Sequence, residues 1–203
     1  GGRPTGSDGH TFYGSVFGGG SGYFPYAAGK WHDKAGSVGG NITVDITGGH
    51  ILTNLYGGNE MTNVGKEKSA TTGNVTINFG GTATLGVPRT LAQITVHPVT
   101  CYLFGGGKGD QRVFFNKDTN VQNVTVNVTG GTIYGSVFGG GEDGHVQRNV
   151  NMTISGGKIG TWGTSYVDGN IFGGGRGFSG EALTAGVVGG DINVNISAGH
   201  IFG

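Results

Sequence analysis

Cysteine, proline and charge are all scarce in this chain of 203 residues, and each shortage excludes something. The single cysteine, Cys101, excludes an internal disulfide bond. Its place beside Tyr102 and Leu103 predicts a small buried side chain rather than a nucleophile. No apolar run approaches about 18 residues, so we predict no membrane-spanning segment. No signal peptide is visible either.

The chain also has no excess of charge of either sign, because 12 Lys and Arg residues balance 12 Asp and Glu residues. A protein that binds nucleic acid or an anionic membrane usually carries a basic patch or a basic excess. We therefore expect neither nucleic acid nor a membrane surface as a partner.

Glycine, in contrast, contributes 48 residues, several times its usual share of about 7%. The pattern is not that of collagen, because glycine does not fall at every third position and there are only 4 prolines. The chain does not resemble a disordered tract either, since charge is low and β-branched residues come in alternating runs.

One aromatic phrase is repeated along the chain. The letters YGSVFGGG occur twice, at 13–20 and at 134–141, and degenerate copies lie at 55–58, 103–107 and 171–175. Such self-similarity predicts one structural unit that is used repeatedly. We expect its aromatic residue to form a structural ladder, made of Phe17, Tyr56, Phe104, Phe138 and Phe172.

A second phrase precedes most copies of the first and alternates polar with apolar residues. It reads NITVDITGG at 41–49 and recurs from 74, 123, 149 and 191. A period of two is typical of a half-buried β-strand. Ile42, Val44 and Ile46 should face a core, while Asn41, Thr43, Asp45 and Thr47 should face outward as part of polar ladders.

The unit is therefore an alternating strand, a Gly-Gly corner, a short strand ending in an aromatic, a glycine cluster and a loop of variable length. The repeats fall roughly at 1–39, 40–73, 74–122, 123–148, 149–189 and 190–203, within one domain. Because the last of them stops partway through the unit at Gly203, we expect the chain to be a fragment of a longer repeat array.

Two all-β architectures fit this unit. The first is a parallel β-helix, or β-solenoid, of about five to six irregular coils with glycine-rich corners and variable loops. The second is an antiparallel β-sandwich, in which Gly130-Gly131 is a two-residue hairpin turn. We favour the solenoid, because only stacked coils give every copy of a phrase the same surroundings.

Residues 123–141 resemble the glycine-rich repeats of large bacterial surface and secreted proteins that are described as adhesin-like. The resemblance covers essentially the whole chain. It implies an exported β-helical stalk, at the cell surface or outside the cell, that spaces or displays something. It carries over no binding residue, and the implied partners are further copies of the chain or flanking repeats of the parent protein.

The sequence contains no complete motif for calcium binding, nucleotide binding or catalysis. The nearest approach to a repeated calcium motif is GGKGD at 106–110, where Asp110 comes one place early; at the equivalent place Glu142 and Asp143 indicate a solvated turn. The glycine clusters lack the Lys-Ser/Thr and helix of a phosphate loop. We expect no catalytic, cofactor-binding or metal-binding residue, and no cofactor.

The acids and histidines do not form the sets that catalysis needs. Asp45 and Asp191 are each aligned with asparagine in other repeats, which makes them structural rather than a carboxylate pair of a polysaccharide-degrading enzyme. His50 and His200 share one corner position with Thr132 and Lys158 and are expected to be exposed. We expect the protein not to be an enzyme.

A carbohydrate-binding adhesin module is the alternative function. Aromatic residues in the long loops can stack on the sugar rings of host or bacterial glycans, and the candidates are Tyr23, Tyr26, Trp31, Trp162 and Tyr166.

Overall fold

The computed structural model describes residues 14–22, 34–66, 69–88, 101–109, 119–161, 168–177 and 185–202. Within these ranges the protein is all-β and contains no helix, so it also has no helix that is long and apolar enough to cross a membrane. The strands are β1 (Val16–Phe17), β2 (Ile42–Ile46), β3 (His50–Ile51), β4 (Leu55–Tyr56), β5 (Val75–Phe79), β6 (Thr84–Leu85), β7 (Leu103–Phe104), β8 (Asn120–Val121), β9 (Val124–Ile133), β10 (Val137–Phe138), β11 (His145–Val146), β12 (Val150–Ile159), β13 (Ile171–Phe172) and β14 (Ile192–Ile201).

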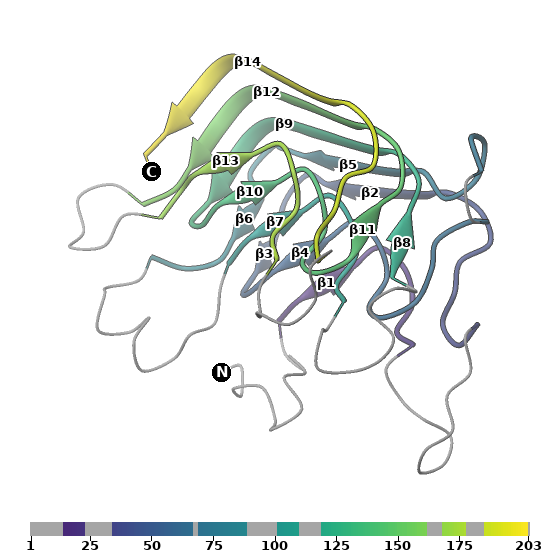
Figure 1. Cartoon of the computed structure of the whole chain (residues 1–203). Coiled ribbons are helices and arrows are strands. Elements are labelled where there is room, and N and C mark those ends of the chain that lie inside the picture. Colours follow the sequence, from purple (N-terminus) through teal and green to yellow (C-terminus); the bar gives the residue numbers. More distant parts are fainter. Residues whose placement is uncertain are drawn as a thin grey trace.

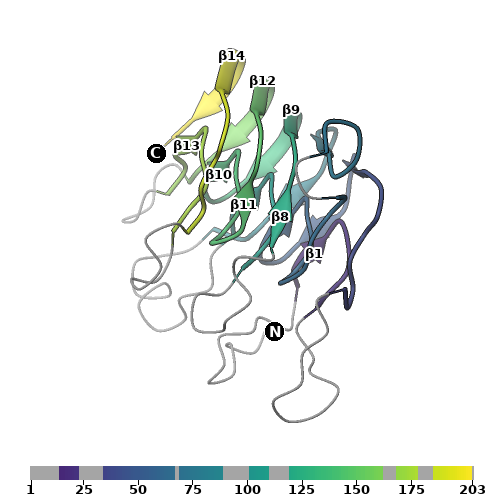
Figure 2. The same ribbon diagram turned by 45° about the vertical axis from the view of Figure 1, so that its right-hand side comes forward.

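These strands form three sheets, each of which takes its strands from successive repeats in chain order. The aromatic sheet has the order β1-β4-β7-β10-β13. The long sheet has the order β2-β5-β9-β12-β14, with β3 and β6 beside them, and β8 pairs with β11 in a small third sheet. The long strands lie side by side along the upper surface in Figure 1, and Figure 2 shows the same succession from another side.

Every pairing between named strands is parallel, and equivalent residues of neighbouring repeats lie opposite each other. In the long sheet, for example, Val75 pairs with Ile42 on one side and with Val124 on the other. The all-β, parallel part of the prediction is confirmed. The repeated phrases are alike because each copy has another copy as its neighbour.

The antiparallel alternative is wrong at the place where it was most specific. Gly130 and Gly131 do not reverse the chain, because β9 continues through them from Val124 to Ile133 and stays parallel to β12. Register shifts at Gly156, and a positive φ of 75° at Gly131 and 87° at Gly157, mark the corner as a bulge. A bulged residue with φ > 0 bends a strand, and glycine adopts that conformation without steric cost.

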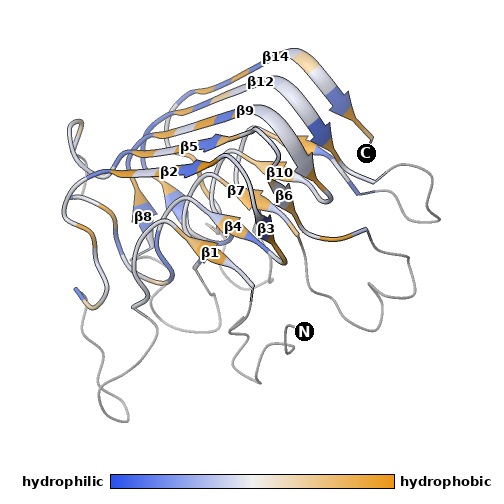
Figure 3. Ribbon diagram, turned by 180° about the vertical axis from the view of Figure 1, so that it is seen from behind, coloured by the Kyte–Doolittle hydropathy of each residue, from blue (hydrophilic) through white to orange (hydrophobic). Residues whose placement is uncertain are grey.

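The core is one aliphatic cluster contributed by all three sheets. Along β2, Ile42 and Val44 are buried while Thr43 and Asp45 are exposed, as the alternation predicts. The same alternation continues over the first five residues of β9 and of β12, whereas every residue of β14 is exposed. Figure 3 shows the hydropathy of these strands. Cys101 is buried as well, as expected. A strand shows a side chain to each face in turn, so a period of two in the sequence becomes an apolar and a polar face.

The outward face carries hydrogen-bonded ladders of asparagine. At the start of the long strands, the side-chain oxygen of Asn74 accepts a hydrogen bond from the backbone N–H of Asn123 at 3.3 Å, and that of Asn123 accepts one from Asn149 at 3.2 Å. Asn78 Nδ2 donates to Asp45 at 2.7 Å further along the strand. Asn149 in turn accepts from the backbone of Asp191 at 2.9 Å. Asp45 and Asp191 therefore occupy asparagine positions, as predicted.

Candidate functional site

The aromatic residues of the five short strands form one column. Neighbouring ring centroids are 4.7 Å apart for Phe17 and Tyr56, 5.1 Å for Tyr56 and Phe104, 5.0 Å for Phe104 and Phe138, and 4.7 Å for Phe138 and Phe172, and the ring planes are nearly parallel. The spacing matches the separation of about 4.7–4.9 Å between neighbouring strands, so the parallel register itself stacks the rings.

This aromatic column is separate from the aliphatic core. In each strand of the aromatic sheet the aliphatic residue comes first, and Leu55 and Leu103 belong to the core cluster. The next residue points to the opposite face, where Tyr56, Phe104 and Phe138 form a buried cluster of their own. The column thus lies on the far side of the aromatic sheet, and it becomes more exposed at its end, where Phe172 is 45% exposed.

The glycine that follows each aromatic is required by close backbone approach. A β-carbon added to Gly105 would lie 2.2 Å from the carbonyl oxygen of Gly139, and one added to Gly139 would lie 2.3 Å from that of Gly173. No larger residue fits at such a distance. These glycines let one repeat lie directly against the next, and they do so without a positive φ.

A charged column lies directly beyond the glycines. It consists of the fourth residue after each aromatic of the column and is made of Ser21, Glu60, Lys108, Glu142 and Arg176. Isolated parallel bridges join Ser21 to Glu60, Glu60 to Lys108, and Glu142 to Arg176. The backbone of Glu142 is hydrogen-bonded to Gly107 and Gly109, on either side of Lys108. From Glu60 onward the charge alternates in sign from one repeat to the next.

The charged column is largely buried, so the alternation of its charges affects the stability of the fold. The side chain of Glu60 is 3% exposed, that of Lys108 is 7% exposed and that of Glu142 is 8% exposed. Ser21 Oγ donates a hydrogen bond of 2.8 Å to Glu60 Oε2. A charge removed from water is stable only with a partner of opposite sign or hydrogen bonds, and a like charge in the next repeat would be costly.

One hydrogen bond links the aromatic and charged columns across an intervening repeat. The Tyr56 hydroxyl donates to Glu142 Oε2 and accepts from Asn54 Nδ2 at 3.0 Å. Burial raises the pKa of the Glu142 carboxyl above its ordinary value of 4.5, although the attraction of Lys108 and Arg176 acts in the opposite direction. Burial and the neighbouring Glu142 raise the pKa of Tyr56 well above 10.0, so its hydroxyl keeps the proton that it donates.

Arg176 adds a second connection between the columns. Its Cζ atom lies 5.2 Å from the centroid of the Tyr102 ring, a cation–π geometry. The Tyr102 ring in turn packs against Phe138 at 5.5 Å and against Phe104 at 6.1 Å. The two columns therefore form one network that runs from Phe17 and Ser21 to Phe172 and Arg176.

The sequence-based interpretation of residues 142 and 143 was wrong. A solvated turn was expected there, but Glu142 and Asp143 are 8% and 3% exposed. The signal was available: the fourth residue after each column aromatic reads Ser, Glu, Lys, Glu, Arg in successive repeats. The alternation in sign is visible only when the copies are aligned with one another.

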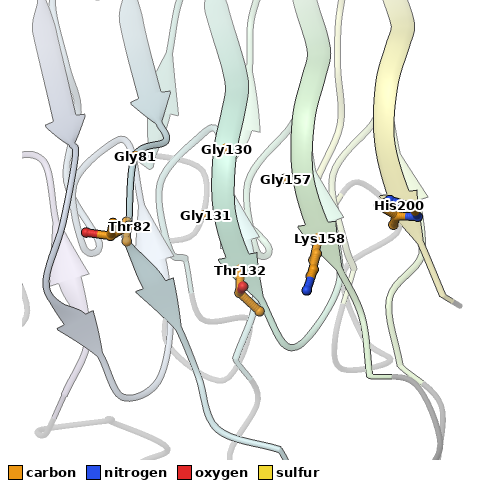
Figure 4. A pocket seen from close by; sticks show the side chains of 9 residues that line it. Gly81, Thr82, Gly130, Gly131, Thr132, Gly157, Lys158 and His200 are labelled. Carbon is orange, nitrogen blue, oxygen red and sulfur yellow. The ribbon is translucent and has the colours of Figure 1, made fainter.

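A shallow groove at the Gly-Gly corner is a second, weaker candidate. Figure 4 shows Thr132, Lys158 and His200 on successive strands beside the bare glycines. The groove has a volume of about 400 Å³ and lies open to solvent. The pairings of Thr132 with Lys158 and of Lys158 with His200 confirm that these residues share one position. His50 stands at the same position beside Thr84 and is exposed, as expected.

The five glycan-contact candidates, Tyr23, Tyr26, Trp31, Trp162 and Tyr166, lie outside the described residues. Among the described residues, no group of three or more His, Cys, Asp and Glu side chains is placed to hold a metal ion. No protein-family model, no curated protein and no solved structure matches the chain.

Proposed function

We propose that the chain is a segment of a parallel β-solenoid that acts as a rigid stalk or self-assembling scaffold in a bacterial surface or fibre-forming repeat protein. The observation that carries this proposal is the strand order. Both large sheets take their strands from successive repeats, and equivalent residues are paired in register along each long strand up to the Gly-Gly corner. A chain that passes each sheet once per repeat and advances by one strand follows the path of a solenoid.

The side-chain ladders suit such a role mechanically. Three kinds of ladder run through successive repeats: the apolar core, the stacked rings and the asparagine hydrogen bonds. A repeat cannot tilt or slide without breaking contacts of all three kinds at once, which supports a stiff rod. Because stability in a repeat array is a sum over repeats and their interfaces, the length of such a rod can change without loss of the fold.

Location outside the cell is part of the proposal and is supported by the resemblance to adhesin-like repeats. The near-zero net charge also suits a spacer that is not meant to bind a charged polymer. The buried charged column contacts the chain's own aromatic column, which favours a role in holding repeats together over a role in binding a solute.

The test is to lengthen the rod from within. A second copy of residues 74–148 inserted after Arg148 adds two repeats in phase, because Asn149 occupies the same place in the repeat as Asn74. It also preserves the alternation of charge. Small-angle X-ray scattering should show an unchanged cross-section and a maximum dimension increased by about 9–10 Å, which is two strand spacings.

The uninserted chain is the control for that measurement. An inserted chain that stays folded but grows in cross-section, or does not become longer, would refute the solenoid. A chain that unfolds on insertion would contradict the proposal that its length is adjustable.

A further inference from the structure

At one end of the long sheet, apolar side chains are exposed at positions whose equivalents in the other repeats form the core. We call it the tail surface: strand β14, Phe172 at the end of β13, and Arg176. Its apolar residues Ile192, Val194 and Ile196 are 45%, 44% and 49% exposed. Their partners in β12 are Val150, Met152 and Ile154, which are 0%, 1% and 0% exposed. β14 is the free edge of the long sheet in Figures 1 and 2.

The opposite end of the long sheet is closed by comparison. Ile42 and Val44 of β2 are 7% and 9% exposed, although β2 is also the last strand on its side. The two ends therefore differ: one is covered and the other leaves the whole of β14 exposed. An apolar edge strand of this length attracts another strand.

The ladders define what kind of strand fits. Asp191 occupies the position at which each asparagine side chain accepts the backbone N–H of the next repeat. Asn193 stands in the outward ladder and already donates to Asn151 at 3.1 Å. Phe172 presents an exposed ring face at the ring spacing of the column. A short strand that ends in an aromatic, followed by a parallel strand of the same alternating type, continues all of these ladders.

The charged column adds a selection by sign. Its charges run negative, positive, negative and positive from Glu60 to Arg176. The first three of these residues are buried and Arg176 is half-buried, so like charges in adjacent repeats are costly. The next place in this column lies against Arg176. A basic residue there would repel the guanidinium, whereas an acid would extend the alternation.

We propose that the tail surface binds one further repeat of the same kind, parallel to β14, and that the charged column selects a repeat with an acidic residue directly after its glycine cluster. This inference rests on the proposed solenoid. A second copy of the chain docked by its β2 end fits less well, because that end is covered and offers uncharged Ser21 opposite Arg176.

The chain itself contains a repeat suitable for a test. The backbone N–H of Phe202 donates to the carbonyl of Ile159 at 2.9 Å, as that of Tyr134 donates to Leu85 at 2.9 Å. Phe202 and Tyr134 are thus equivalent, and a copy of residues 136–161 fused after Gly203 continues in phase. This copy carries its own Glu142, and two matched variants replace that copied residue, Glu142→Gln and Glu142→Lys.

Two measurements distinguish these fused chains: hydrogen exchange of the β14 amides and the melting temperature. With the copied glutamate, the β14 amides become protected relative to those of the unfused chain. The Lys variant melts at least about 4 °C below the Glu variant, with the Gln variant between them.

The alternative outcomes separate the two proposals. If all three copies protect β14 and melt together, the repeat docks without selection by charge, and the inference is wrong while the solenoid stands. If no copy protects β14, the tail surface does not take a repeat, and the insertion of residues 74–148 decides the solenoid separately. If the unfused chain is a stable dimer with β14 already protected, a second copy is the occupant, and the inference is overturned.

Discussion

Truncation of Phe104 to alanine is the sharpest test of the aromatic column. Phe104 lies in its middle, is 0% exposed, and stacks on Tyr56 at 5.1 Å and on Phe138 at 5.0 Å, with Tyr102 packed at its edge. Neighbouring backbone and rings are fixed by the parallel register, so the space left by the ring cannot collapse easily. Phe→Ala at such a site costs about 3–5 kcal/mol of the free energy of unfolding.

The matched control is Phe172→Ala at the end of the same column. Phe172 is 45% exposed and stacks on Phe138 at 4.7 Å. It loses roughly half as much buried surface, so its truncation should cost about 1–2 kcal/mol on the same scale of burial.

Urea denaturation followed by circular dichroism measures both variants, and melting temperature gives an independent reading. For a domain of this size about 1 kcal/mol corresponds to about 2–4 °C, so Phe104→Ala should lower the melting temperature by roughly 6–20 °C. A loss below about 1 kcal/mol for Phe104→Ala, or an equal loss for the two variants, would show that the column does not stabilise the stack as its burial indicates.

Three further predictions concern the glycines, the asparagine ladder and the buried carboxyl. Gly105→Ala should cost more than about 2 kcal/mol because its β-carbon meets backbone at 2.2 Å, whereas Gly39→Ala, with no heavy atom within 4 Å, should change stability by less than about 0.5 kcal/mol in the same urea assay. Asn123→Ala should cost about 1–3 kcal/mol, since it bridges two repeats, and the exposed end residue Asn41 should cost less on truncation; equal losses would contradict the ladder. Burial raises the pKa of Glu142, so the folded protein binds the carboxyl proton more tightly than the unfolded chain does. The resulting contribution to the free energy of unfolding is present below about pH 4.5 and is lost as the pH rises through the folded-state pKa. Glu142→Gln should therefore gain stability relative to the unsubstituted chain between about pH 4 and about pH 7 in urea titrations, and a constant difference across that range would refute the raised pKa.

The strands were predictable because their signal is local. Alternation from Ile42 to Ile46 specifies which side chains face inward, and the register follows from the identity of the phrases at 123 and 149. The corner position was predictable too, since Thr132 and Lys158 directly follow a Gly-Gly pair and His200 follows the matching Ala198-Gly199 pair.

The charged column was not predicted, although all of its residues can be read directly from the sequence. The sign of a charge has no meaning for a single loop, and the sequence around Glu142 and Asp143 is that of an ordinary polar turn. Burial and pairing with neighbouring repeats give these residues their role, and both depend on how closely the glycines let the repeats approach.

The sequence alone therefore determined the repeating unit: its strands, its inward and outward faces, and the aromatic that recurs in each copy. Tertiary structure decided three things. It set the strands parallel, placed the aromatic column on the far side of its sheet from the aliphatic core, and left β14 exposed while Ile42 and Val44 are covered. The physical reason is that periodicity is a property of one strand, whereas burial is a property of what lies against it.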